Sequence, residues 1–247
     1  MMSQRVRHHR RRNGLVDGVF VVVLMVGGLC GLIGLRVALL AFSDVAGGWA
    51  DLLLFGVIGL AATAVWWWRQ RIRRRAAQAI EQWERTAGWE PVLLGQRWPW
   101  VDMVRWAETV TVLRAYRKPG LIVGLVEFAE NGLGAAVDRH AGRAAFAIVT
   151  LARPAPTGAV RVYREVAARR RGEDEFRRRF RVIGGELSPA LQRAHVDGEV
   201  PAWTCTGDQM FVFVPLDGPL WPWHLERAAA KARRVVELSA VEVGEDG

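Results

Sequence analysis

Residues 18–35 read GVFVVVLMVGGLCGLIGL, eighteen positions without a charged side chain. As an α-helix this run would be about 27 Å long, just short of the roughly 30 Å hydrocarbon core of a bilayer. Continuing the helix through Phe42 supplies the missing length. Arg36 would then lie near the outer end, where its long side chain can reach the headgroups. The run therefore predicts a first transmembrane helix over residues 18–42.

A second apolar run, LLLFGVIGLAATAVWWW, covers residues 52–68. Asp51 can stand at its outer boundary, so the second predicted span covers residues 51–68. Residues 43–50 remain as a short outer loop, which is enough for a tight helical hairpin. Two buried helices of a soluble protein would need a large surrounding domain, and a cleaved signal peptide has a shorter apolar region with no second span directly behind it. A membrane hairpin is the better explanation of both runs.

Arginine is distributed unevenly around these runs. Five arginines lie in the basic tail, residues 1–17, five lie in residues 69–75, and only Arg36 lies between the two runs. Cytoplasmic loops carry an excess of Lys and Arg, so this pattern predicts a multi-pass protein of the plasma membrane with both termini in the cytoplasm. Residues 1–75 hold a net charge of +8 out of the total +9. The orientation of the predicted spans in the membrane therefore accounts for the basic charge of the chain. The charge does not favour nucleic acid as a partner.

Two kinds of residue are expected to fit the hairpin to the bilayer. Tryptophans prefer the membrane–water interface, and they would form an inner belt of Trp66, Trp67 and Trp68 with an outer anchor at Trp49. Small residues let helix backbones approach closely, and here they are Gly27, Gly28, Gly31, Gly34, Gly56 and Gly59. They predict packing within the hairpin, with a homodimer face as the alternative.

Beyond the second run the helical spacing continues and then gives way to strand and turn signals. Apolar residues at three- and four-residue steps, with Gly88 as a stop, predict a juxtamembrane helix within residues 69–88. Residues 89–240 then combine short apolar strands, turns and two helices, which predicts a small α+β domain with an antiparallel sheet. Residues 241–247 form an acidic tail.

The elements expected in this domain follow from local patterns. Strands are predicted at 108–116, at 121–129, at 142–151, from 159 onward and at 175–183, and helices at 189–195 and 221–238. Pro154 and Pro156 are expected to end the third strand. Gly207 and Asp208 are expected to form a hairpin turn between two short strands. Trp98 and Trp100 are expected to dock on the bilayer or on the juxtamembrane helix, together with Trp106, and a ligand cage is the alternative.

Three segments near the C-terminus carry a resemblance. EFRRRFRV (175–182), SPALQRA (188–194) and WTCTGDQMFVFV (203–214), followed by an amphipathic helix, resemble the tail of a family of uncharacterised actinobacterial two-pass membrane proteins. The resemblance covers residues 173–238 and the general layout. It implies a cytoplasmic α+β domain behind two spans, and it implies no catalytic residue.

Motifs for chemistry are missing from the sequence. It contains no phosphate-binding GxxxxGK[ST], no GxSxG and no HExxH, and the histidines beyond residue 9 stand alone. We therefore predict no metal site, no cofactor and no catalytic residue, and an enzyme with a dispersed active site is the alternative. Cys30 and Cys205 would lie in different phases, so no disulfide is expected between them.

One basic stretch could carry a partner. On a strand, Arg177, Arg179 and Arg181 would share one face, with Phe176, Phe180 and Val182 on the other. A solvated face is the simplest interpretation, and an anionic lipid, an acidic protein or a nucleic acid is the alternative. The leading functional prediction is a membrane-anchored interaction or regulatory domain at the inner leaflet. Its expected partners are the lipid bilayer and another membrane protein.

Overall fold

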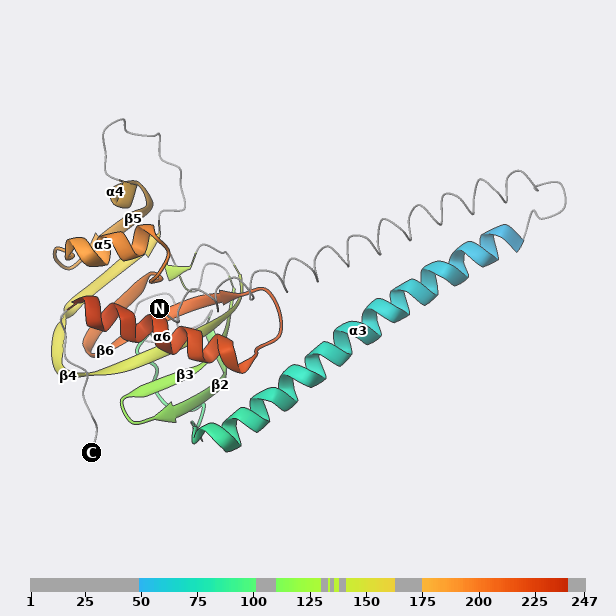
Figure 1. Ribbon diagram of the computed structural model, residues 1–247, viewed down its shortest axis with the longest axis horizontal. Coiled ribbons are helices and arrows are strands. Elements are labelled where there is room, and N and C mark those ends of the chain that lie inside the picture. Colours follow the sequence, from blue (N-terminus) through green and yellow to red (C-terminus); the bar gives the residue numbers. More distant parts are fainter. Residues whose placement is uncertain are drawn as a thin grey trace, which may run out of the picture. The chain divides into compact units, whose positions relative to one another are not determined.

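The computed structural model describes residues 49–100, 110–129, 133, 136–137, 141–162 and 175–239 (Figure 1). The chain divides into two compact units, Met1–Arg71 and Ile72–Gly247, and each is described by itself. Several sequence predictions lie outside the described residues: the first span (18–42) with its four glycines, both tails and Trp106. The side chains of Trp49 and of residues 50–54 are also outside the description.

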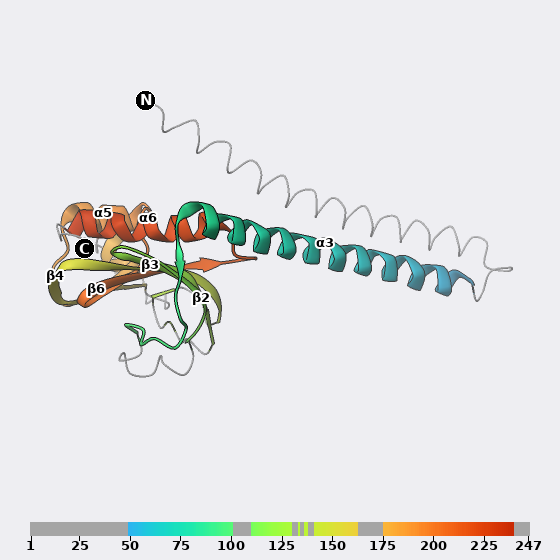
Figure 2. The same cartoon turned by 90° about the horizontal axis from the view of Figure 1, so that it is seen from below.

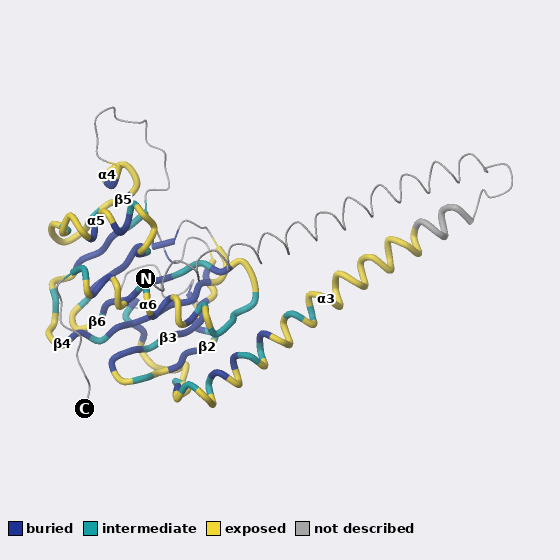
Figure 3. Tube along the Cα trace, viewed as in Figure 1, coloured by how far each residue is buried: buried dark blue, intermediate teal, exposed yellow. Residues whose placement is uncertain are grey.

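Helix α3 (Trp49–Ala87) is one continuous helix of 39 residues. In the first unit it exposes large apolar side chains, among them Phe55, Leu60 and Trp66 at 70%, 73% and 65%. From Ile72 onward the helix buries one face instead, at Ala76, Ile80 and Trp83 (Figure 3). It ends at Ala87, as the sequence predicts, because Gly88 adopts φ 65°. In the part of the chain that the structure describes, no helix is long and apolar enough to cross a membrane.

The second unit is an α+β domain built on a six-stranded antiparallel sheet, which confirms the predicted fold class of this region. Strands β1 (Glu90–Pro91), β2 (Val110–Lys118) and β3 (Leu121–Phe128) pair in order, and β3 then pairs the first half of β4 (Gly142–Val162). The second half of β4 pairs β5 (Phe180–Ile183), while β6 (Trp203–Leu216) pairs β4 along almost its whole length. β3 and β5 therefore follow one another along the same edge of β4.

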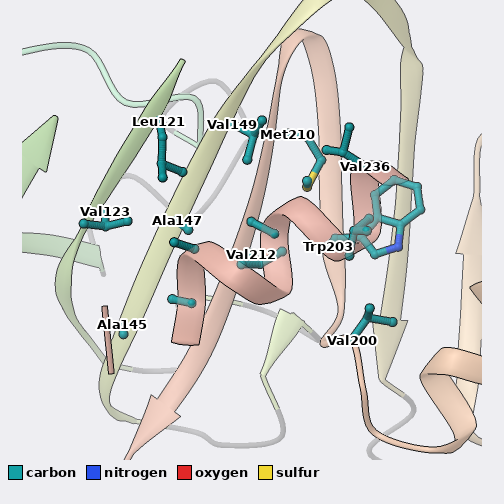
Figure 4. Close-up of a cluster of buried hydrophobic side chains, with 14 of the residues drawn as sticks. Leu121, Val123, Ala145, Ala147, Val149, Val200, Trp203, Met210, Val212 and Val236 are labelled. Atoms are coloured by element: carbon teal, nitrogen blue, oxygen red, sulfur yellow. The ribbon is translucent and has the colours of Figure 1, made fainter. Parts of the chain in front are cut away.

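Each face of the sheet has its own core. One face is covered by α5 (Pro189–Val196), by α6 (Pro222–Ser239) and by the end of α3 from Ile72 on (Figure 2). Figure 4 shows this core, with Val149, Met210 and Val212 of the sheet facing Val236 of α6. The other face is covered by Trp98, Trp100, Leu133, Ala136 and Val137.

Several local predictions are confirmed. Pro119 and Gly120 form the turn between β2 and β3, and Gly120 adopts φ 68°. Ser188 caps α5, because its hydroxyl accepts a hydrogen bond from the Leu191 amide at 3.2 Å. Helix α6 covers almost the predicted range, 222–239 instead of 221–238.

Two predictions of strand ends were wrong. β4 does not stop at Pro154 and Pro156, and β6 does not turn back at Gly207. The β4–β6 register shifts twice between Thr150 and Gly158. Neither proline is among the paired residues of the two strands, so no backbone N–H is needed there for a hydrogen bond between the strands. Gly207 adopts φ 60° opposite Ala155 in this irregular stretch. The prolines and the glycine therefore mark bulges in two long strands.

Candidate functional site

The basic stretch 175–183 is not a single strand, so this prediction was wrong. Residues Glu175–Arg179 form the short helix α4, and β5 begins only at Phe180. Phe176 and Phe180 are both buried and their rings stack with centroids 5.3 Å apart. Because the two phenylalanines anchor the segment, its arginines all remain on the outside.

The four arginines of this stretch have different roles. The guanidinium of Arg179 donates to the carbonyl oxygen of Val196 at the end of α5 (3.1 Å), pairs with Glu175 (3.4 Å) and lies over the Phe180 ring. Arg179 is thus committed to holding α4 against α5. Among the described residues no ion pair is made by the other three, Arg177, Arg178 and Arg181. We call these three the basic surface.

The charge near the basic surface extends into β4. Arg161 stands directly opposite Arg181 across the β4–β5 ladder. Its guanidinium donates to the Trp203 carbonyl oxygen at 3.0 Å, and burial lowers the pKa of Arg161 to about 10. The side chain therefore keeps its charge at neutral pH. Two like charges facing each other across a ladder destabilise a sheet slightly, and an anion near them would relieve that repulsion.

The basic surface lies at one end of the domain. Helix α5 contacts the C-terminal half of α6: Ser188 donates to the Leu238 carbonyl oxygen, and Lys231 donates to the Gly198 carbonyl oxygen just after α5. At the opposite end of α6, Glu226 accepts a hydrogen bond from the indole of Trp83 on α3 (3.1 Å). In Figure 1, α4 and β5, which carry the basic surface, lie away from the last turns of α3.

His195 is buried in the same region but is held for structure. The indole of Trp203 donates to its Nε2 at 3.2 Å, and the rings of Phe176 and Phe180 lie 5.8 and 5.1 Å from its ring. Burial, helped by the nearby charge of Lys231, lowers the pKa of His195 to about 4. The imidazole is neutral at pH 7, and the acceptor role of Nε2 puts its proton on Nδ1. Nδ1 has no hydrogen-bond partner among the described residues.

The described residues contain no cluster of metal-binding side chains. No three His, Cys, Asp or Glu side chains come close enough there to hold one ion. Cys205 is a free, buried thiol whose pKa is raised by its burial.

Three of the four predicted membrane anchors lie on the described part of α3. Trp66, Trp67 and Trp68 are all exposed on α3, and the guanidinium of Arg71 lies 5.2 Å from the Trp67 ring. A Cβ added to Gly56 or Gly59 would meet no atom of the described residues within 4 Å. Their predicted role in span packing stays a prediction.

Trp98 and Trp100 are core residues, so the prediction of a docking surface there was wrong. Both are buried, and the Trp100 ring lies 5.2–5.6 Å from the rings of Phe146, Phe211 and Phe213. In a second Trp-Pro-Trp sequence, Trp221–Trp223, Trp223 is exposed and Trp221 is half-buried, and the sequence analysis did not single it out. The repetition of this three-residue sequence was the signal that could have drawn attention to it.

Comparison with known proteins adds no assignment. No family model matches the chain, and no curated protein or solved structure is significantly similar to it.

Proposed function

We propose that this chain is a membrane-anchored interaction or regulatory domain, held at the inner leaflet of the plasma membrane by a hairpin over residues 18–42 and 51–68, with both termini in the cytoplasm. The observation that carries the proposal is the continuity of α3. One helix presents exposed apolar side chains over residues 55–68 and then contributes Ile80 and Trp83 to the core of the α+β domain. The helix that would form the second span thus continues into the domain without a break.

The chemistry of α3 supports a lipid environment for its first half. The exposed side chains of Phe55, Ile58 and Leu60, close together on α3, would leave a large apolar area in water. Removing such area from water is favourable by about 25 cal/mol per Å². The three exposed tryptophans are followed by five arginines in residues 69–75. An aromatic belt beside basic side chains is the usual composition of the cytoplasmic interface.

Fractionation and a topology reporter test this proposal. We expect the full chain to stay in the membrane pellet until detergent is added, and a reporter fused after Gly247 to be shielded in intact cells. Replacing Ile58 and Leu60 by lysine should weaken membrane retention, since a charge at the centre of a span costs about 3 kcal/mol. Lysine at Glu199 and Glu237, two exposed positions of the domain, is the matched control. A chain that is soluble without detergent, or a reporter reachable from outside, would overturn the proposal.

The basic surface suggests what the domain binds. Its three guanidinium groups are exposed and make no ion pair among the described residues. We propose that they bind an acidic segment of a protein, with an anionic lipid as the alternative. Arginine forms bidentate hydrogen bonds with carboxylates, so closely spaced arginines suit such a segment.

Crosslinking with mass spectrometry in intact membranes tests whether the basic surface binds an acidic protein segment. We expect crosslinked peptides that are rich in Asp and Glu, formed near residues 177–181 and lost when Arg177, Arg178 and Arg181 are changed to Gln. The matched control changes three other exposed arginines, Arg85, Arg227 and Arg233, to Gln. Equal loss in both variants, or crosslinks insensitive to both, would remove the basic surface as the binding site.

A further inference from the structure

The acidic tail, residues 241–247, begins just after the end of helix α6. It carries Glu242, Glu245 and Asp246 and no basic side chain. Helix α6 ends at Ser239, so a single residue separates it from the tail. Because the tail is attached there, its carboxylates stay close to the side chains that surround the end of α6.

The end of α6 and the basic surface lie next to the same helix, α5. The hydroxyl of Ser188, at the start of α5, donates to the Leu238 carbonyl oxygen at 3.2 Å. At the other end of α5, the Val196 carbonyl oxygen accepts a hydrogen bond from Arg179 of α4 at 3.1 Å. Figure 1 shows α6, α5 and α4 following one another in this order. Since α5 is about 12 Å long, the path along it from Leu238 to the guanidinium of Arg179 is about 20 Å.

The tail is long enough to cover this distance. An extended chain advances by about 3.3–3.6 Å per residue, so Glu245 and Asp246, seven and eight residues beyond Leu238, have a backbone reach of about 23–29 Å. Arg177 and Arg178 stand beside Arg179 on α4. At least two carboxylates of the tail can therefore reach the basic surface.

Basic side chains nearer to the end of α6 already have partners. Arg234 pairs with Glu237 at 3.1 Å. Lys231 donates to the Gly198 carbonyl oxygen, and Arg193 donates to a carbonyl oxygen of its own helix. The last carbonyl groups of a helix also carry partial negative charge, which disfavours carboxylates directly beside the end of α6.

The basic surface offers a better place for these carboxylates. Its three guanidinium groups are exposed and make no ion pair among the described residues. Arg181 also faces Arg161 across the β4–β5 ladder, so a carboxylate there would reduce the repulsion between two like charges. A short flexible connection gives a tethered group an effective concentration in the millimolar range, so weak contacts are enough for the tail to compete with a free ligand.

We propose that the acidic tail occupies the basic surface and competes there with the acidic protein segment that the domain binds. This inference rests on the proposed binding of such a segment. The tail and the basic surface both belong to the second unit, so the contact does not depend on how the domain is placed against the anchor. Exposed ion pairs are individually weak, and a partner with more carboxylates displaces the tail.

A photocrosslinker in the tail tests the contact in the full chain, solubilised in detergent. p-Benzoylphenylalanine replaces Val243, which stands between Glu242 and Glu245, and the products of irradiation are digested and identified by mass spectrometry. We expect crosslinks to residues 175–183 of the same chain. Higher salt should lower their yield, because exposed ion pairs are screened.

Two arginine variants show whether the crosslinks depend on the basic surface. Changing its three arginines to Gln should lower the yield at 175–183 several-fold. The matched control again changes three other exposed arginines to Gln and should leave the yield unchanged: Arg85, Arg227 and Arg233. Arg233 is the control for a contact made on α6 itself.

The competition is measured with partner crosslinks in intact membranes. The variant Glu242→Gln, Glu245→Gln, Asp246→Asn keeps the length of the tail and removes its charge. We expect it to raise the yield of crosslinks between acidic partner peptides and residues 177–181 several-fold over the wild type. An unchanged yield would overturn the competition.

The remaining outcomes separate this inference from the proposed function. Tail crosslinks that fall on α6, or that join only two different chains, overturn the contact. Partner crosslinks at 177–181 without any tail crosslink at 175–183 overturn the contact and leave the proposed binding of an acidic segment intact. A tail crosslinked at 175–183 in a chain that captures no acidic partner removes the proposed binding, and the competition with it.

Discussion

At the scale of single residues, His195 is the side chain whose protonation the fold opposes most clearly. Its folded-state pKa is about 4, against about 6.5 for an unperturbed histidine. Between these values the unfolded chain binds a proton that the folded chain does not, so stability rises with pH in this window. We expect the free energy of unfolding to fall by about 3 kcal/mol through this group as the pH is lowered from 7 to below 4.

Urea unfolding of the detergent-solubilised chain, followed by near-ultraviolet circular dichroism across this pH range, measures the effect. Acidic groups also titrate in the window, so the informative quantity is the difference between the wild type and His195→Gln. The glutamine oxygen can still accept the hydrogen bond of Trp203 but does not titrate. The same pH slope in both proteins would show that His195 is not the cause.

Phe176 and Phe180 show why the local fold of the basic stretch was not readable from the sequence. A spacing of four residues places two side chains on the same face of a strand and also of a helix. Both structures can bury the pair, but a strand would place Arg178 on the buried face, whereas the helix leaves all three arginines between the phenylalanines exposed. The stretch becomes helix at Glu175–Arg179 because Arg179 can then reach the Val196 carbonyl oxygen at the end of α5, a contact 17 residues away.

At the scale of elements, the close packing of β2, β3 and β4 depends on a position without a side chain. A Cβ added at Gly124 would collide with the Arg114 carbonyl oxygen and with the ring of Phe146. We expect Gly124→Ala to destabilise the domain by about 1–3 kcal/mol, the usual cost of overpacking a core. Thermal unfolding in detergent would measure it.

Gly95 provides the control for this substitution. It is exposed, and an added Cβ would meet nothing within 4 Å. Gly95→Ala should therefore leave the midpoint of unfolding nearly unchanged. If the two variants unfolded alike, the tight approach at Gly124 would not limit stability.

The strands show how far pattern can be read. The sequence predicts β2 and β3 because β-branched residues lie on both sides of a turn signal. In the structure the chain does reverse at this turn. The signals at Pro154 and Gly207 are of the same kind, yet they bend β4 and β6 without ending them. Pairing along the rest of both strands holds them together across the irregular stretch, and that pairing joins residues up to 73 positions apart, as in Arg143 with Leu216.

At the scale of the whole molecule, the end of α3 belongs to the α+β domain. Ile80 and Trp83 lie in the same core cluster as Leu225 and Ala229 of α6. We expect a fragment starting at Ile72 to unfold cooperatively and to need no detergent. A fragment starting at Trp89 should fail to fold stably, since losing a large buried side chain costs about 2–5 kcal/mol each, against a total stability of about 5–15 kcal/mol.

Expression of the two fragments, with solubility and urea unfolding as readouts, decides this point. Equal stability would mean that α3 only touches the domain. Failure of both fragments would mean that the first unit is needed for folding.

By itself the sequence determined the local features of this protein. The α+β class, the helical face of residues 72–87, the stop at Gly88, the cap at Ser188 and the β2–β3 turn each depend on neighbours within a few residues, and all are present in the structure. Tertiary structure decided which Trp-Pro-Trp copy is buried, which arginines stay free of the described ion pairs, and where β4 and β6 continue. These outcomes depend on contacts between distant segments, which local spacing does not encode.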